Sequence, residues 1–142
     1  MLRLISSVIG GLLLAFLIVF ATDAAFHAML PTSAALPDTN DPEAMRQYVA
    51  GQPTGVLSAL LAGWGIAVFA GSATASRFGG RRELPGWIVT GIFLLATLVN
   101  FTLVEHPIWM MVTGVGGIVV AGWLGGHLTR RSAEPNRAPT PP

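Results

Sequence analysis

The sequence predicts an all-α membrane protein, a four-transmembrane-helix bundle with a short amphipathic helix in its first outer loop. Composition is the first observation: 52% of the 142 residues are hydrophobic and only 11% are charged, whereas a soluble domain carries about 25% charged residues. The second is the grouping of apolar residues into four runs, each long enough to cross a hydrocarbon core about 30 Å thick. The third is the arginine content, which gathers on one side of those runs.

The four spans are expected over about residues 4–25, 55–76, 86–104 and 108–128, in one membrane domain from residue 1 to residue 128. All ten prolines lie outside these spans or at their edges, because a proline ring interrupts the hydrogen bonds of a helix. The first run is also compatible with a secretory signal peptide. It is longer than a usual signal-peptide core, and Asp23 disturbs the cleavage pattern in one of two registers. We therefore expect an uncleaved first helix.

Arginine placement predicts the orientation. With four spans, seven of the eight basic residues share one side of the membrane, and only Arg46 lies on the other. The seven are Arg3, Arg77, Arg81, Arg82, Arg130, Arg131 and Arg137. Basic residues are retained in the cytoplasm, so we expect a multi-pass protein of a bacterial inner membrane with both termini cytoplasmic. The loop of residues 26–54 would then face outward, and the Pro-rich residues 129–142 would form a disordered cytoplasmic tail.

The outer loop contains its own helix signal, "NDPEAMRQYVAG". Asp41 has the residue type of an N-cap, Pro42 suits the first helical position, and Gly51 suits the stop. Met45 and Tyr48 fall on one face, so the helix is expected to be amphipathic and to lie on the outer membrane surface or across the end of the bundle.

Small residues recur at every fourth position in two of the spans. Lipid provides no hydrophobic drive for helices to associate, so close backbone approach along such faces must supply the packing. We expect these residues to pack helices within one chain, with a homodimer face as the alternative. They are Gly55, Ala59, Gly63, Ala67, Gly71 and Ala75 in the second span and Gly117, Ala121 and Gly125 in the fourth.

Polar residues are expected to meet at the outer rim. Glu105 and His106 form the tight turn between the third and fourth spans, and Asn100 lies about one helical turn below. Asp23 and His27 end the first span four residues apart, so they project from the same face of that helix. The five residues form a candidate outer polar cluster.

Three interpretations of this cluster are open. The first is a hydrogen-bonded cap on the bundle or a set of separate solvated residues. The second is a proton-linked or substrate-linked site, because an imidazole titrates near neutral pH. The third is a divalent metal with ligands drawn from His27, His106, Asp23 and Glu105, since imidazole and carboxylate groups bind such ions. We predict no cofactor. His127 is alone at the inner end of the fourth span and is expected to be an interfacial anchor.

The segments "LPDTNDPEAMRQYVAGQPTG" and "EHPIWM" resemble a group of small bacterial four-helix inner-membrane proteins of unassigned function. The resemblance implies the same topology and adds no mechanism. It departs at Leu30–Thr32, "LPT", where a second proline is expected. The matching positions are Asp23, His27, Pro37, Asp41, Pro42, Ala44, His106, Pro107 and Trp109.

These features favour a non-enzymatic accessory, assembly or scaffold subunit whose partners are the lipid bilayer and either a second copy or another membrane protein. The alternatives are a small transporter or channel with an outer polar vestibule, and a protein with an outer-rim metal site. An enzyme is disfavoured because no set of nucleophile, base and oxyanion donor can be named. A net charge of +1 argues against nucleic acid binding, and the absence of cysteine excludes disulfides and thiolate sites.

Overall fold

A computed structural model describes residues 1–29, 38, 41–80 and 82–131 of the chain. Within this part the protein is all-α, and four of its helices are long and apolar enough to cross a membrane. This confirms the predicted fold class of a multi-pass helical bundle. The helices are α1 (Leu2–Met29), α2 (Pro42–Ala50), α3 (Thr54–Phe78), α4 (Glu83–Leu103) and α5 (Ile108–Arg131).

Each long helix extends beyond the span expected from the sequence, by one to four residues at one or both ends. α1 continues to Met29, into the segment expected to be loop, and α5 continues to Arg131, into the segment expected to be tail. Hydropathy predicts which part of a helix lies in hydrocarbon. The helix can continue past that part until a residue that disfavours helix, such as proline, follows. Proline follows at Pro31 and Pro135, and the preceding residues can continue a helix in the headgroup region. Residues 132–142 of the expected tail lie outside the described residues.

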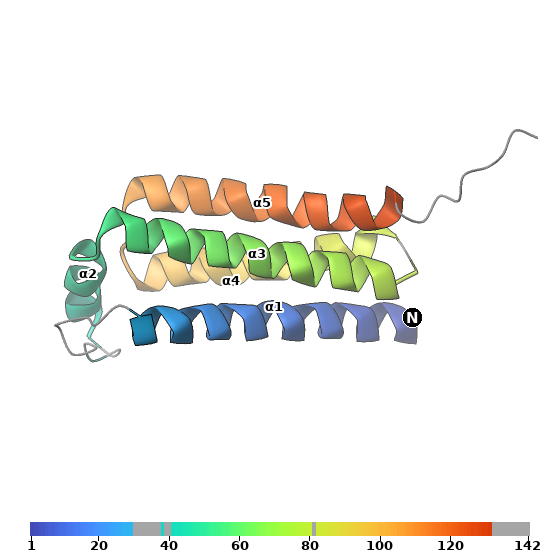
Figure 1. Cartoon of the computed structure of the whole chain (residues 1–142), viewed down its shortest axis with the longest axis horizontal. Coiled ribbons are helices and arrows are strands. Elements are labelled where there is room, and N and C mark those ends of the chain that lie inside the picture. Colours follow the sequence, from blue (N-terminus) through green and yellow to red (C-terminus); the bar gives the residue numbers. More distant parts are fainter. Residues whose placement is uncertain (30–37, 39–40, 81, 132–142) are drawn as a thin grey trace, which may run out of the picture.

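The four long helices lie side by side, and α2 crosses one end of the bundle (Figure 1). α3 contacts α1, α4 and α5, whereas α1 and α5 each pack against α3 and α4. This position suits the sequence of α3, which is rich in glycine, alanine and serine along the whole helix. Small side chains allow neighbouring helices to approach on several sides at once.

α1 and α3 approach each other closely. A Cβ atom added to Gly11 would lie 2.6 Å from the carbonyl oxygen of Gly71, and one added to Gly71 would lie 2.7 Å from the carbonyl oxygen of Gly11. Closer to α2, a Cβ on Gly63 would lie 2.6 Å from the Cγ2 atom of Thr22. The two backbones therefore touch at Gly11 and Gly71, where glycine is required for steric reasons.

The predicted small-residue stripes enter these contacts only in part. In α3, Gly63, Ala67, Gly71 and Ala75 are buried and Ala59 is half-buried; in α5, Gly125 is buried and Ala121 is half-buried. Gly55 and Gly117, by contrast, are exposed, and a Cβ on either would meet nothing within 4 Å.

Gly55 and Gly117 therefore do not pack helices within the described chain, and the alternative of a homodimer face stays a prediction. Gly117 directly precedes Ile118 and so lies about 100° around α5 from the buried face to which Ile118 belongs. Gly55 lies in the first turn of α3. The inward face of α5 instead includes Met110, Gly114, Ile118, Gly122 and Gly126.

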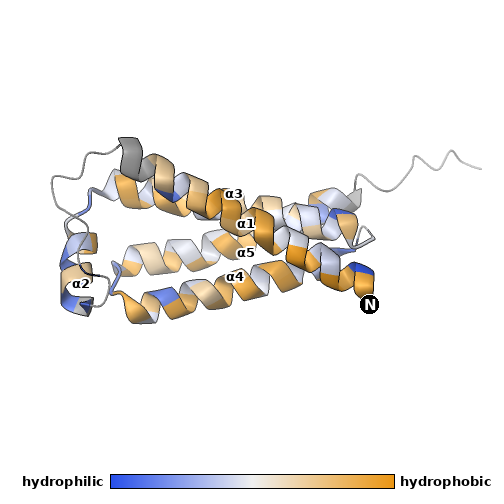
Figure 2. Cartoon of the chain, turned by 90° about the horizontal axis from the view of Figure 1, so that it is seen from below, coloured by the Kyte–Doolittle hydropathy of each residue, from blue (hydrophilic) through white to orange (hydrophobic). Residues whose placement is uncertain are grey.

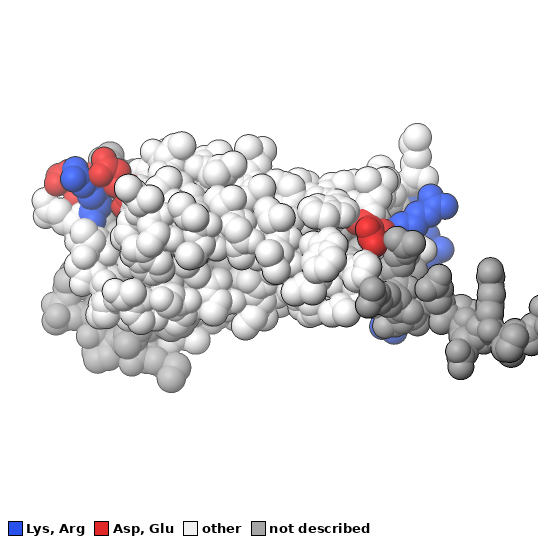
Figure 3. All heavy atoms as spheres, turned by 90° about the horizontal axis from the view of Figure 1, so that it is seen from above, with Lys and Arg blue, Asp and Glu red and all other residues white. Residues whose placement is uncertain are grey.

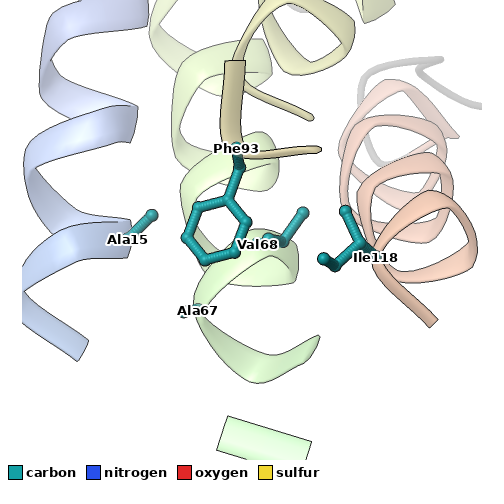
Figure 4. Packing of buried hydrophobic residues seen from close by; sticks show 5 residues of the cluster. All are labelled: Ala15, Ala67, Val68, Phe93 and Ile118. Carbon is teal, nitrogen blue, oxygen red and sulfur yellow. The ribbon is translucent and has the colours of Figure 1, made fainter. Parts of the chain in front are cut away.

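The centre of the bundle is a small apolar cluster to which each long helix contributes (Figure 4). Phe93 of α4 points into it and supplies its largest side chain; the other members are Ala15, Ala67, Val68 and Ile118. Packing of this kind holds membrane helices by van der Waals contact, since the surrounding lipid is as apolar as the core.

The outer surface of the long helices carries large hydrophobic side chains, and hydrophobic residues predominate along these helices (Figure 2). On α1, for example, Leu13, Leu17 and Phe20 are 67%, 66% and 77% exposed. Charged side chains on the face shown in Figure 3 gather at the two ends of the molecule, with an uncharged band between them. This distribution fits a protein surrounded by hydrocarbon along its length.

Candidate functional site

α2 begins as its sequence predicts. The carboxylate of Asp41 accepts hydrogen bonds from the backbone N–H groups of Glu43 and Ala44, and Pro42 occupies the first helical position. At the other end the N–H of Gly51 donates to the carbonyl oxygen of Gln47. These caps hold a nine-residue helix too short to be stable alone, and they fix the direction in which its side chains project.

One of those side chains reaches the turn between α4 and α5. The Nε atom of Arg46 lies 2.9 Å from the Oε2 atom of Glu105, while Glu43 lies farther away, 3.7 Å from a terminal guanidinium nitrogen. The Arg46 and Glu105 side chains are 54% and 72% exposed, so the pair contributes about 1 kcal/mol or less. Its effect is positional, because it joins α2 to the α4–α5 turn. Sequence reasoning missed it, since nothing local indicates that Arg46 folds back over that turn.

His106 is held within the same turn. Its Nδ1 atom lies 2.6 Å from the carbonyl oxygen of Val104. A carbonyl oxygen can only accept, so Nδ1 carries the hydrogen and donates it. The ring meets the edge of Phe101 at a centroid distance of 5.0 Å and is half-buried. His106 therefore closes the turn and packs on the end of α4.

The other members of the predicted outer cluster are placed as follows. Asp23 is half-buried near the α2 end of α1, and Asn100 is exposed on α4 one turn before its end. The side chain of His27 lies outside the described residues. Among the residues described, no group of three or more His, Asp or Glu side chains is arranged to hold a metal ion. A direct contact between the Asp23–His27 pair and the Glu105–His106 pair stays a prediction.

A hollow of about 120 Å³ opens on the flank of the bundle beside Asn100. It is lined by Phe16 and Val19 of α1, by Trp64 of α3, and by α4 residues between Phe93 and Asn100. In the sequence, Asn100 is a polar residue about one helical turn below Glu105, but no pattern there indicates a hollow beside it. Its existence depends on the angle between α1 and α4.

A second group of polar side chains lies at the opposite end of the bundle, in its interior. The hydroxyl oxygens of Ser72 and Thr90 are 2.9 Å apart, and both lie within hydrogen-bonding distance of the Gly86 carbonyl oxygen, at 3.2 and 2.8 Å. Both side chains are buried, and Thr90 packs closely on Gly122 of α5. These hydroxyls join α3 to α4 beside α5.

Ser76 lies one turn from Ser72 and differs from it. Its residue is fully buried, yet its Oγ atom has no hydrogen-bond partner among the described residues. A Cβ added to Gly86 would lie 2.5 Å from this oxygen and one added to Gly126 would lie 3.5 Å from it. The oxygen is thus enclosed by the glycine backbones of α4 and α5, which offer at best weak C–H contacts. The spacing of Ser72 and Ser76 beside the buried stripe is a signal that the sequence analysis did not use.

The prediction that His127 stands alone is wrong. Its Nδ1 atom lies 3.4 Å from the Oε1 atom of Glu83, and Trp123 stacks on its ring at 5.2 Å. Glu83 begins α4 and its side chain is 29% exposed, while that of His127 is 26% exposed. The pair joins the start of α4 to the end of α5. The expectation was wrong because Glu83 is far from His127 in sequence and meets it only through the antiparallel packing of the two helices.

Comparison of the chain with protein-family models, with curated proteins and with solved structures finds no match.

Proposed function

We propose that this protein is a non-enzymatic accessory, assembly or scaffold subunit of a bacterial inner membrane. The observation that carries the proposal is the character of the interior. The buried polar side chains among the described residues are all serine or threonine, namely Ser7, Ser72, Ser76, Thr90 and Thr97. The centre of the bundle is filled by the apolar cluster around Phe93. A transporter places polar groups or broken helices near the membrane midplane, and an enzyme needs a converging set of reactive groups.

The outer polar residues support the same proposal. The carboxylate of Glu105 is paired with Arg46, and the ring of His106 is engaged with Val104 and Phe101. Glu105 and His106 thus stabilise the α4–α5 turn and its contact with α2. They favour a cap over a vestibule that binds and releases a solute.

Orientation and partners belong to the proposal. The arginine distribution of the sequence favours cytoplasmic termini, with α2 and Arg46 on the outer side. A scaffold of this kind would offer its partners the apolar flanks of its long helices, and it would offer the surface of α2 at the outer end. We propose no cofactor.

The test has two arms. A tagged copy is expressed at its natural level, and complexes are separated on native gels after mild solubilisation; a chromosomal deletion is compared with it. We expect the protein to migrate in a larger membrane complex at fixed stoichiometry, and the deletion to lower the amount of that complex. In the second arm the purified protein is reconstituted into liposomes. Saturable ion or solute flux, abolished by substituting Asn100 or His106, would overturn the proposal in favour of a transporter.

A further inference from the structure

We propose that the hollow beside Asn100 is a binding site for one acyl chain of a phospholipid from the membrane leaflet on the α2 side. The site lies on the flank of the bundle, between α1 and α4, with Trp64 of α3 contributing to its wall.

The hollow arises from the way α1 and α4 diverge. The two helices touch where Gly11 approaches Val89 and where the rings of Phe16 and Phe93 lie 6.1 Å apart. Towards the end that carries α2 they move apart (Figure 2). A wedge-shaped space is left along the side of the bundle that faces lipid, and its lining residues close it towards the interior.

The walls of this space are apolar. Phe16, Val19 and Ala96 contribute hydrocarbon, and the hydroxyl of Thr97 already donates to the carbonyl oxygen of Phe93 at 3.0 Å. An ordered water needs two to four polar partners, which these walls do not supply. Hydrocarbon is the filling that both the walls and the surrounding bilayer favour.

The size of the hollow selects the kind of hydrocarbon. A helix from a second chain is roughly 10 Å across with its side chains and would occupy roughly 800 Å³ over a 10 Å length. The hollow itself measures about 120 Å³. A helix can lie across it but cannot fill it, whereas a single extended chain can.

Asn100 gives the site a polar end and a direction. Its side chain is exposed, and its amide makes no hydrogen bond with any residue that the structure describes. An amide without a partner in hydrocarbon costs several kcal/mol. Asn100 lies one turn before the end of α4. In the proposed site this places it near the ester groups of the lipid, and its NH₂ donates to an ester oxygen. The acyl chain would then run about 10 Å along α4, from Asn100 to Phe93.

The test uses the fluorescence of Trp64. A variant in which Trp87, Trp109 and Trp123 are replaced by Phe is placed in detergent micelles, and phosphatidylcholine with brominated acyl chains is added. Bromine quenches indole fluorescence on contact, and the neutral headgroup removes attraction to the arginines. We expect quenching to saturate near one lipid per protein. Asn100→Leu should raise the half-saturating lipid fraction by about fivefold, which corresponds to one hydrogen bond.

Ala96→Phe provides the second comparison, because it fills the hollow. Ala62→Phe is its matched control, since Ala62 is also an exposed alanine but lies on α3 outside the lining. We expect Ala96→Phe to abolish the saturable quenching and Ala62→Phe to leave it unchanged. Quenching that rises linearly with lipid in the parent protein, or equal effects of the two alanine variants, would overturn the proposal.

Two further outcomes would also overturn it. If Ala96→Phe is unstable, the test depends on Asn100→Leu. A half-saturating lipid fraction that is unchanged in Asn100→Leu would contradict the proposed site. If Ala96→Phe dissociates an oligomer and the parent protein shows no saturable quenching, the hollow is covered by a second copy. Binding of lipid does not depend on membership of a larger complex, so this result and that of the native-gel experiment are independent.

Discussion

Gly11 of α1 and Gly71 of α3 face each other so closely that each would place a new Cβ atom within 2.7 Å of the other's carbonyl oxygen. The obstacle is backbone, which cannot swing aside as a side chain can. The contact is therefore sensitive to the smallest added side chain.

We expect Gly71→Leu to destabilise the bundle by at least about 1–3 kcal/mol, the usual cost of overpacking, and Gly71→Ala to be milder but still destabilising. The matched control is Gly117→Leu on α5, where a Cβ meets open space. Thermal unfolding in detergent micelles measures both. A Gly71→Leu variant as stable as Gly117→Leu would show that α1 and α3 do not pack as described.

Ser72 and Ser76 form a second matched pair, since both are fully buried on α3 one turn apart. Ser72→Ala removes a hydroxyl bonded to Gly86 and Thr90 and should cost about 0.5–1.5 kcal/mol. Ser76→Ala removes an oxygen without a partner in the described chain and should be neutral or stabilising. The same unfolding measurement applies, and a larger loss from Ser76→Ala would contradict the described hydrogen bonds.

Arg46 and Glu105 should be energetically coupled. A double-mutant cycle with Arg46→Ala and Glu105→Ala is expected to give a coupling energy of about 0.2–1 kcal/mol that falls in high salt, because both groups are largely exposed. Hydrogen exchange of the α2 amides provides the readout. The cycle of Arg46 with Glu43 is the comparison, since that pair is 3.7 Å apart and should couple less. Coupling that is zero, or independent of salt, would argue against the pair.

Topology can be tested with single cysteines, because the chain contains none. Thr39→Cys should react with a membrane-impermeant maleimide added to intact cells, whereas Ser132→Cys should react only after the cells are opened. Labelling of Ser132→Cys in intact cells would reverse or abolish the proposed orientation.

Much of the fold was predictable because its causes are local. Length and hydropathy define the spans, and Asp41, Pro42 and Gly51 define α2 through backbone capping. The contacts between helices could not be predicted, because they depend on how the helices are rotated and tilted against each other. Gly117 and Ile118 are neighbours in sequence, yet only Ile118 faces the interior, and a repeat of small residues does not show which face of α5 turns inward. The pairs Arg46–Glu105 and His127–Glu83 join residues far apart in sequence, and no local pattern announces them.

The central position of α3 bears on how the protein is made. Synthesis proceeds from the N-terminus, so α1 enters the membrane first and the next long helix to follow is α3. The α1–α3 seam, with its touching backbones at Gly11 and Gly71, can therefore close before α4 and α5 exist. Each later helix meets a partner that is already in place, since α3 contacts both of them. The helices can therefore pack one at a time in the order of synthesis, and each helix can pack as soon as it is inserted.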